Sequence, residues 1–200
     1  MQKNQTARRA GRNLALLCFM LIGLSAAVLT GGTAAPPKRA LTTVILVRHA
    51  EKKDEPTNKD PDLSAAGLTR AQEIARMFGD SGITAIYATQ YKRTQQTVKP
   101  LADKLGIAVT QLEAQKPGEV ISQIQAQHTG GLVFVAGHNN TVVQIIHGLG
   151  GPQLPIISET EYDNLFVLTI AGDGKVDLLK LKYGSPMPGP APTPGAKMMP

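Results

Sequence analysis

Three short apolar runs in this chain each lead into an arginine or a histidine. Val44–Val47 is followed at once by Arg48 and His49, and two later runs lead into Arg93 and His138. A guanidinium group is a planar fork of N–H donors that suits phosphate oxygens, and an imidazole can carry a proton or act as a nucleophile. These residue types suit the binding of a phosphorylated ligand, provided that the fold brings them together.

The three apolar runs have the length and composition of buried strands. Val44–Val47 is rich in β-branched residues, and Ile86–Thr89 and Leu132–Ala136 are similar in length. Parallel strands in one sheet would bring their carboxyl ends to one edge, which is where open α/β sheets bind ligands.

The remaining pattern alternates helices with strands, and it predicts a three-layer α/β sandwich with a mainly parallel sheet. A polar loop occupies residues 52–62, and Ser64 is the expected N-cap of a helix that ends at Gly79. Pro100 should kink or break the next helix. The other expected elements are a strand at Ala85–Thr89, a helix from Tyr91 to Gly106, a strand at Ile107–Leu112, helices at Gly118–Gln127 and Thr141–His147, and a hairpin of Asn164–Ile170 with Lys175–Lys182.

Four motifs, in this order, resemble those of the histidine phosphatase superfamily, also called the phosphoglycerate mutase-like family. The resemblance covers residues 42–182, and it implies the phosphoglycerate mutase-like fold. The motifs are Arg48-His49-Ala50-Glu51, Leu63-Ser64-Ala65-Ala66-Gly67, Arg93 within residues 89–97, and Gly137-His138.

The resemblance implies a role for each residue at the strand ends. His49 would be the nucleophile that forms a phosphohistidine, which water then hydrolyses. Arg48 and Arg93 would bind the phosphate oxygens, and His138 would complete the catalytic pair and donate to a phosphate oxygen. Thr89, at a position that is commonly serine in the family, is expected among the substrate-binding residues.

The residue that protonates the leaving group is open at this stage. In one branch of the family an acid directly follows the second histidine, but here Asn139 and Asn140 follow His138. In the mutase-like branch the acid is a glutamate after the third strand, for which Glu113 is the nearest match. Glu51 is the rival because it lies two residues from His49.

The resemblance implies a phosphoric monoester hydrolase of the histidine acid phosphatase type that works through phosphohistidine. The family uses no metal, and no His-x-Glu or His-x-x-x-His spacing is present, so we predict no metal and no cofactor. The substrate would be a small-molecule or protein phosphomonoester. A non-catalytic phosphate- or phosphoprotein-binding module on the same fold is the alternative.

Composition argues against a nucleic-acid partner. The net charge is +6, but four of the 21 basic residues lie in the first 35 residues, which contain no acid, so the rest carries 17 basic and 15 acidic residues. Aromatic residues make up 4% and tryptophan is absent, which leaves few platforms for base stacking.

The first 35 residues have the pattern of a secretory signal peptide. A basic start is followed by the uncharged residues 14–30 and then by small residues up to Ala35. We expect an exported, periplasmic or secreted protein with no membrane contact after cleavage; an uncleaved membrane anchor is the alternative. Cys18, the only cysteine, lies in this segment.

Two further boundaries complete the expected organisation. Residues 36–183 form the histidine phosphatase domain. Residues 184–200 contain six prolines and form a disordered tail, which could be a spacer or a docking segment.

Overall fold

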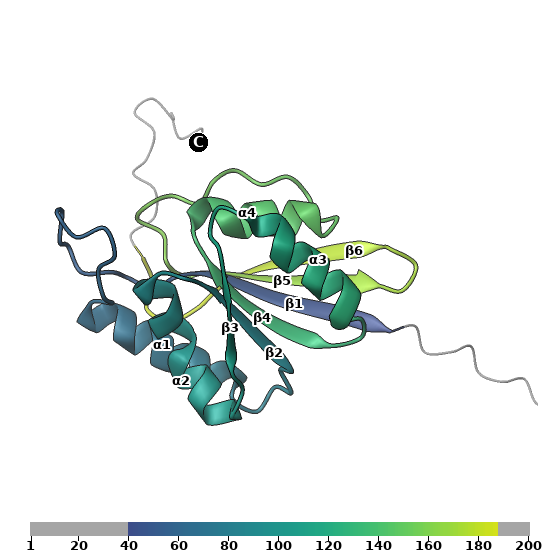
Figure 1. The fold of residues 1–200 in the computed structure, drawn as a ribbon, viewed down its shortest axis with the longest axis horizontal. Coiled ribbons are helices and arrows are strands. Elements are labelled where there is room, and N and C mark those ends of the chain that lie inside the picture. The colour runs from purple at the N-terminus through teal and green to yellow at the C-terminus, as the bar shows by residue number, and fades with distance from the viewer. Residues whose placement is uncertain (1–39, 188–200) are drawn as a thin grey trace, which may run out of the picture. The chain divides into compact units, whose positions relative to one another are not determined.

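A computed structural model describes residues 40–187 of the chain (Figure 1). The predicted signal peptide and the part of the predicted tail after residue 187 lie outside the described residues. The elements are β1 (Leu41–Arg48), α1 (Ala65–Phe78), β2 (Ala85–Thr89), α2 (Lys92–Leu105), β3 (Val109–Leu112), α3 (Pro117–Gln127), β4 (Leu132–Gly137), α4 (Asn139–Gly148), β5 (Asn164–Ala171) and β6 (Val176–Lys182).

All of these strands belong to one six-stranded sheet, with the order β3-β2-β4-β1-β5-β6. The pairs β1–β4, β2–β4 and β2–β3 are parallel, whereas β5 pairs antiparallel with β1 and with β6. The predicted fold class, a three-layer α/β sandwich with a mainly parallel sheet, is confirmed. The closing hairpin of β5 and β6 was also predicted.

The two faces of the sheet carry separate hydrophobic cores because side chains alternate along each strand. On β1, Val44 and Leu46 face the core under α3 and α4. Ile45 and Val47 face the core under α1 and α2. Figure 1 shows the two helix pairs on opposite sides of the sheet. A central strand that is buried on both faces explains why β1 has a continuous apolar sequence rather than an alternating one.

The structure differs from the predicted elements at a few positions. Helix α2 continues through Pro100, although an interior proline removes one helical hydrogen bond. Val98 and Leu101 on either side of it are fully buried, so packing against the sheet holds the helix together. Strand β3 begins at Val109 rather than at Ile107, and α4 begins at Asn139, two residues early.

No helix within residues 40–187 is long and apolar enough to cross a membrane.

The start of α1 packs directly on the loop that follows β1. Ser64 caps the helix by accepting a hydrogen bond from the Gly67 N–H, and the Ser64 N–H donates to the Glu51 carbonyl at 2.9 Å. A Cβ atom at Gly67 would lie 2.1 Å from that same carbonyl oxygen. Gly67 is therefore required for this close approach, and the Leu63–Gly67 motif serves to place the segment after the predicted nucleophile.

We expect Gly67→Ala to lower the free energy of unfolding by roughly 1–3 kcal/mol, the usual range for overpacking. Gly118→Ala is the matched control, because Gly118 lies in helix α3 and a Cβ there meets nothing within 4 Å. Alanine is favoured over glycine in a helix, so the control should be neutral or slightly stabilising. Urea unfolding of both variants checks this, and equal stabilities would contradict it.

Candidate active site

The carboxyl ends of β1, β2 and β4 form one edge of the sheet, and the predicted site residues meet there. His49 directly follows β1, and its N–H donates to the Gly137 carbonyl at the end of β4 at 2.8 Å. The imidazole rings of His49 and His138 lie with their centroids 5.4 Å apart. A cavity of about 570 Å³ opens at this edge. It is lined by Arg48, His49, Lys52, Tyr91, Arg93, Ala114, Gln115, His138, Asn139, Asn140, Thr141, Gln144 and Glu159.

His49 is held in one tautomer by the backbone of the next residue, Ala50. Its Nδ1 lies 2.8 Å from the Ala50 carbonyl oxygen, which can only accept, so Nδ1 carries the proton. Burial lowers the pKa of His49 to about 3, and the charges of Arg48, His138 and Arg93 act in the same direction. The ring is therefore neutral at pH 7, with an unprotonated Nε2.

His138 is the N-cap residue of α4 and is also buried. Its Nε2 lies 2.9 Å from the Thr89 hydroxyl. Burial lowers the pKa of His138 to about 4, with Arg93 and Arg48 adding to the effect. The free site thus holds two neutral imidazoles among cations.

Arg48 is buried to 2% exposure, and the segment between α4 and β5 surrounds it. Its Nη1 donates to the carbonyls of Ser158, Glu159 and Glu161, and its guanidinium lies 4.2 Å from the centre of the Tyr162 ring. These contacts fix the plane of the guanidinium fork.

Arg93 lies in the first turn of α2 and lines the same cavity. Its guanidinium lies 4.4 Å from the centre of the Tyr91 ring, and Nη1 lies 3.7 Å from a carboxylate oxygen of Asp60. Within the described residues, the Nε atoms of Arg93 and Arg48 are buried without a hydrogen-bond partner. A buried donor without a hydrogen-bond partner destabilises the folded protein by about 1–3 kcal/mol. An anionic ligand that accepted hydrogen bonds from these two Nε–H groups would remove this cost.

Thr89, which we predicted to bind substrate, lies beneath the cavity rather than in its wall. It is 1% exposed and does not line the cavity. Its hydroxyl bonds to His138 and to the Thr94 hydroxyl because β2 ends beneath these side chains. Thr89 therefore contacts the second histidine rather than the space that a ligand would occupy.

The structure does not bring Glu113 to the cavity. β3 ends at Leu112, and the chain then turns so that the Lys116 N–H donates to the Glu113 carbonyl. The Glu113 side chain is exposed, and its neighbours Ala114 and Gln115 line the cavity instead.

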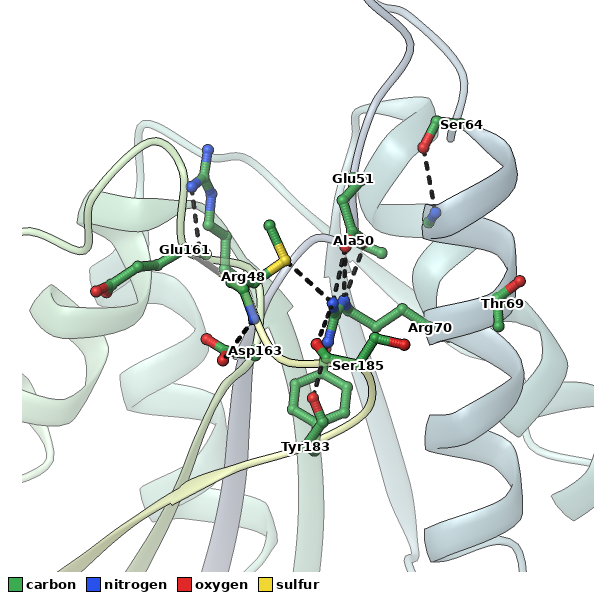
Figure 2. Close-up of polar contacts among 12 residues, drawn as sticks. Arg48, Ala50, Glu51, Ser64, Thr69, Arg70, Glu161, Asp163, Tyr183 and Ser185 are labelled. Carbon is green, nitrogen blue, oxygen red and sulfur yellow. Dashed lines mark hydrogen bonds and ion pairs between the residues drawn. The ribbon is translucent and has the colours of Figure 1, made fainter. Parts of the chain in front are cut away.

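Glu51, the rival proton donor, faces away from the cavity and pairs with Arg70 of α1. The Arg70 guanidinium donates to both carboxylate oxygens of Glu51, at 2.8–3.0 Å. It also donates to the carbonyls of Tyr183 and Ser185 (Figure 2). Arg70 thus joins the loop after His49 to the chain that follows β6, including the first described residues of the predicted tail.

Sequence reasoning missed Arg70 and Glu159. Nothing in the pattern of α1 distinguishes Arg70 from an exposed helical arginine, since its partners come from two distant segments. Glu159 is 74% exposed, lines the cavity, and accepts from Arg48 Nη2 at 2.6 Å and from the Asn139 side chain at 2.7 Å. Its segment has no regular secondary structure, so no periodicity could place it.

The other two histidines of the chain lie outside this cavity. His128 follows α3 and its Nε2 lies 2.7 Å from the Tyr87 hydroxyl. His147 is exposed in the last turn of α4.

Comparison with known proteins agrees with this arrangement. Residues 44–116 match the model of the histidine phosphatase superfamily, branch 1. The matched segment contains Arg48, His49 and Arg93, and the fold adds His138 beside them. Over these residues the chain is similar to the histidine phosphatase superfamily. A search of curated protein sequences finds no significant match.

Several solved structures share the fold. A protein of Agrobacterium tumefaciens assigned as the phosphohistidine phosphatase SixA is 26% identical, with a TM-score of 0.56, over 72% of this chain and 99% of that one. The protein histidine phosphatase SixA in complex with tungstate is 17% identical, with a TM-score of 0.57, over 70% and 96%. Mycobacterial glucosyl-3-phosphoglycerate phosphatase is 12% identical, with a TM-score of 0.56, over 69% and 97%.

The low pKa values of His49 and His138 predict a loss of stability in acid. The unfolded histidines titrate near 6.5, whereas the folded ones titrate at about 3 and about 4. Between these values the unfolded state binds more protons, so the free energy of unfolding should fall as the pH decreases from about 6.5 toward 4. Urea unfolding across this range measures the fall.

We expect this fall to be shallower in His49→Asn, which removes one of the two groups. His147→Asn, at an exposed position, is the control and should keep the wild-type slope. The same slope in all three proteins would show that His49 titrates normally in the folded state.

Proposed function

We propose that this protein is a metal-independent phosphatase that hydrolyses phosphomonoesters through a phosphohistidine on His49. The observation that carries the proposal is the hydrogen bond from His49 Nδ1 to the Ala50 carbonyl, which leaves a neutral Nε2 with its lone pair free. This nitrogen lies among the cations that a phosphoryl group requires.

The geometry supports the following sequence of steps. Phosphate oxygens accept hydrogen bonds from Arg48 and Arg93, including their unpaired Nε–H groups. His49 Nε2 attacks phosphorus, the P–N bond forms, and the P–O bond to the leaving group breaks. Water then attacks phosphorus, and the electron pair of the P–N bond returns to Nε2. The amino terminus of α4 adds a partial positive charge at the same edge.

A non-catalytic phosphate-binding module would need the arginines but not the nucleophile. The fixed tautomer of His49 and its low pKa favour the enzyme, because a group that only binds an anion gains from being protonated. The similar structures named as a protein histidine phosphatase and as a glucosyl-3-phosphoglycerate phosphatase support a phosphatase activity.

The lining of the cavity favours a polar leaving group. Four of the residues that line it carry side-chain amides, namely Gln115, Asn139, Asn140 and Gln144. These groups suit hydrogen bonds to hydroxyl or amide groups of a sugar-like or peptide substrate.

The first test is to trap the intermediate. Labelled substrate should transfer its phosphoryl group to His49, and an alkaline quench should retain it because phosphoramidates are stable in base. His49→Ala should lose both label and turnover, and turnover should persist with a chelator present. An active enzyme that never carries label at His49 would contradict the mechanism.

The second test concerns Arg93. Arg93→Lys keeps the positive charge but loses the fork and the Nε donor, so kcat/KM should fall by a similar factor for every phosphomonoester. Lys99→Arg, on an exposed position of the same helix, is the control and should leave kcat/KM unchanged. A loss confined to one class of substrate would place Arg93 against the leaving group instead.

A further inference from the structure

An alkyl leaving group must gain a proton as the P–O bond breaks, and no carboxylate is free to supply it in the described part of this site. Glu113 lies outside the cavity. Glu51 is paired with Arg70. Glu159 lines the cavity, but its two oxygens already accept from Arg48 and Asn139.

A chain of hydroxyl groups instead controls the protonation of His138. The Thr94 hydroxyl lies 2.9 Å from the Thr89 carbonyl and 2.7 Å from the Tyr91 carbonyl, and carbonyls only accept. When Thr94 donates to one of them, its oxygen accepts the Thr89 hydroxyl proton, at 2.8 Å. The Thr89 oxygen then accepts from His138 Nε2, at 2.9 Å.

This direction of donation fixes the tautomer of His138. Nε2 carries the proton and is bonded to Thr89, so Nδ1 is left as the nitrogen that can exchange a proton with a ligand. A neutral ring in this tautomer presents an acceptor at Nδ1, to which a protonated phosphate oxygen can donate. The arrangement is the reverse of that in His49, where Nδ1 is held and Nε2 is free.

We propose that His138 Nδ1 is the proton donor to the leaving group, and that Thr89 and Thr94 are positioning residues that set its tautomer. This inference rests on the proposed phosphatase function. It assigns to the second histidine the role for which the sequence offered Glu113 or Glu51.

The protons and electrons balance over the cycle. One proton enters the site with the substrate, either because the phosphomonoester binds as its monoanion or because the dianion takes a proton from solvent. This proton is shared between a phosphate oxygen and His138 Nδ1. As His49 Nε2 bonds to phosphorus, the P–O electron pair leaves with the alkoxide oxygen, which takes the proton from Nδ1. In the second half, Nδ1 accepts a proton from the attacking water, and the phosphate product carries it away.

The charges around His138 explain why the proton arrives with the substrate. The rings of His49 and Tyr91 contact the His138 ring. The charged residues that line the same cavity are Arg48 and Lys52 from β1 and its loop, Arg93 from the start of α2, and Glu159 from the segment before β5. In the free protein burial disfavours a charged ring, and the two arginines add to this effect. A bound phosphate offsets their charge and so makes protonation of Nδ1 favourable.

The test compares leaving groups in variants of the hydroxyl chain. Thr89→Val removes the hydroxyl at nearly constant volume. We expect kcat for an alkyl phosphate such as glycerol phosphate to fall by about 10²-fold, the lower end for general acid catalysis, and kcat for p-nitrophenyl phosphate to fall far less. Thr89→Ser restores a hydroxyl and should recover the alkyl rate. Thr69→Val, the same change on the exposed face of α1, should leave both rates unchanged.

A second measurement reads the tautomer directly and needs no turnover. Long-range ¹H–¹⁵N spectra of the free full-length protein should show His138 protonated at Nε2, and Thr89→Val should remove this preference. A proton on Nδ1 in the wild type would overturn the inference, as would equal losses on the alkyl and aryl esters in Thr89→Val. If the wild type hydrolyses neither ester, the proposed function fails and the inference fails with it.

Discussion

The site depends on the register between β1 and β4. Arg48 pairs with Gly137 in a parallel ladder, so the residue that follows each strand is a histidine at the same height on the sheet. A shift of one residue would turn Arg48 and His49 toward the opposite layers, because successive side chains point to opposite faces. In this register Val44 and Leu46 pack into one core, and Ile45 and Val47 pack into the other.

Bringing cations and imidazoles together in this way has an electrostatic cost that the fold must offset. Arg48 is almost fully buried, and its charge is compensated by backbone carbonyls and by Glu159. The histidines respond by remaining neutral, which leaves a lone pair on each ring. The loop after His49 packs closely against Gly67 and is fixed by the Arg70–Glu51 ion pair. These contacts position the loop without a ligand.

Much of this architecture could be predicted from the sequence because the signals were local. Residues 44–47 identified β1, and Ser64 marked the start of α1. Gly106 marked the end of α2, because its φ of 67° lies in the left-handed region, which glycine adopts most easily. The meeting of the strand ends was predicted, but the partners of Glu159 and Arg70 in distant segments were not. Glu159 reaches Arg48 from 111 residues away, and Arg70 meets carbonyls at 183 and 185. Glu113 was predicted to protonate the leaving group from its order along the chain. That order does not determine the direction of its side chain after β3.

The first turns of α2 show how one helix can serve both histidines. Arg93 lies beside the cavity, and the next residue, Thr94, bonds to Thr89 behind His138. One turn later, Thr97 accepts the Ala50 N–H and donates to the Arg93 carbonyl, which fixes the backbone that holds His49 Nδ1. Because these positions are separated by fixed helical spacing, their motif acts as one rigid unit. A displacement of the start of α2 would therefore disturb Arg93 and the hydrogen bonds of both imidazoles together.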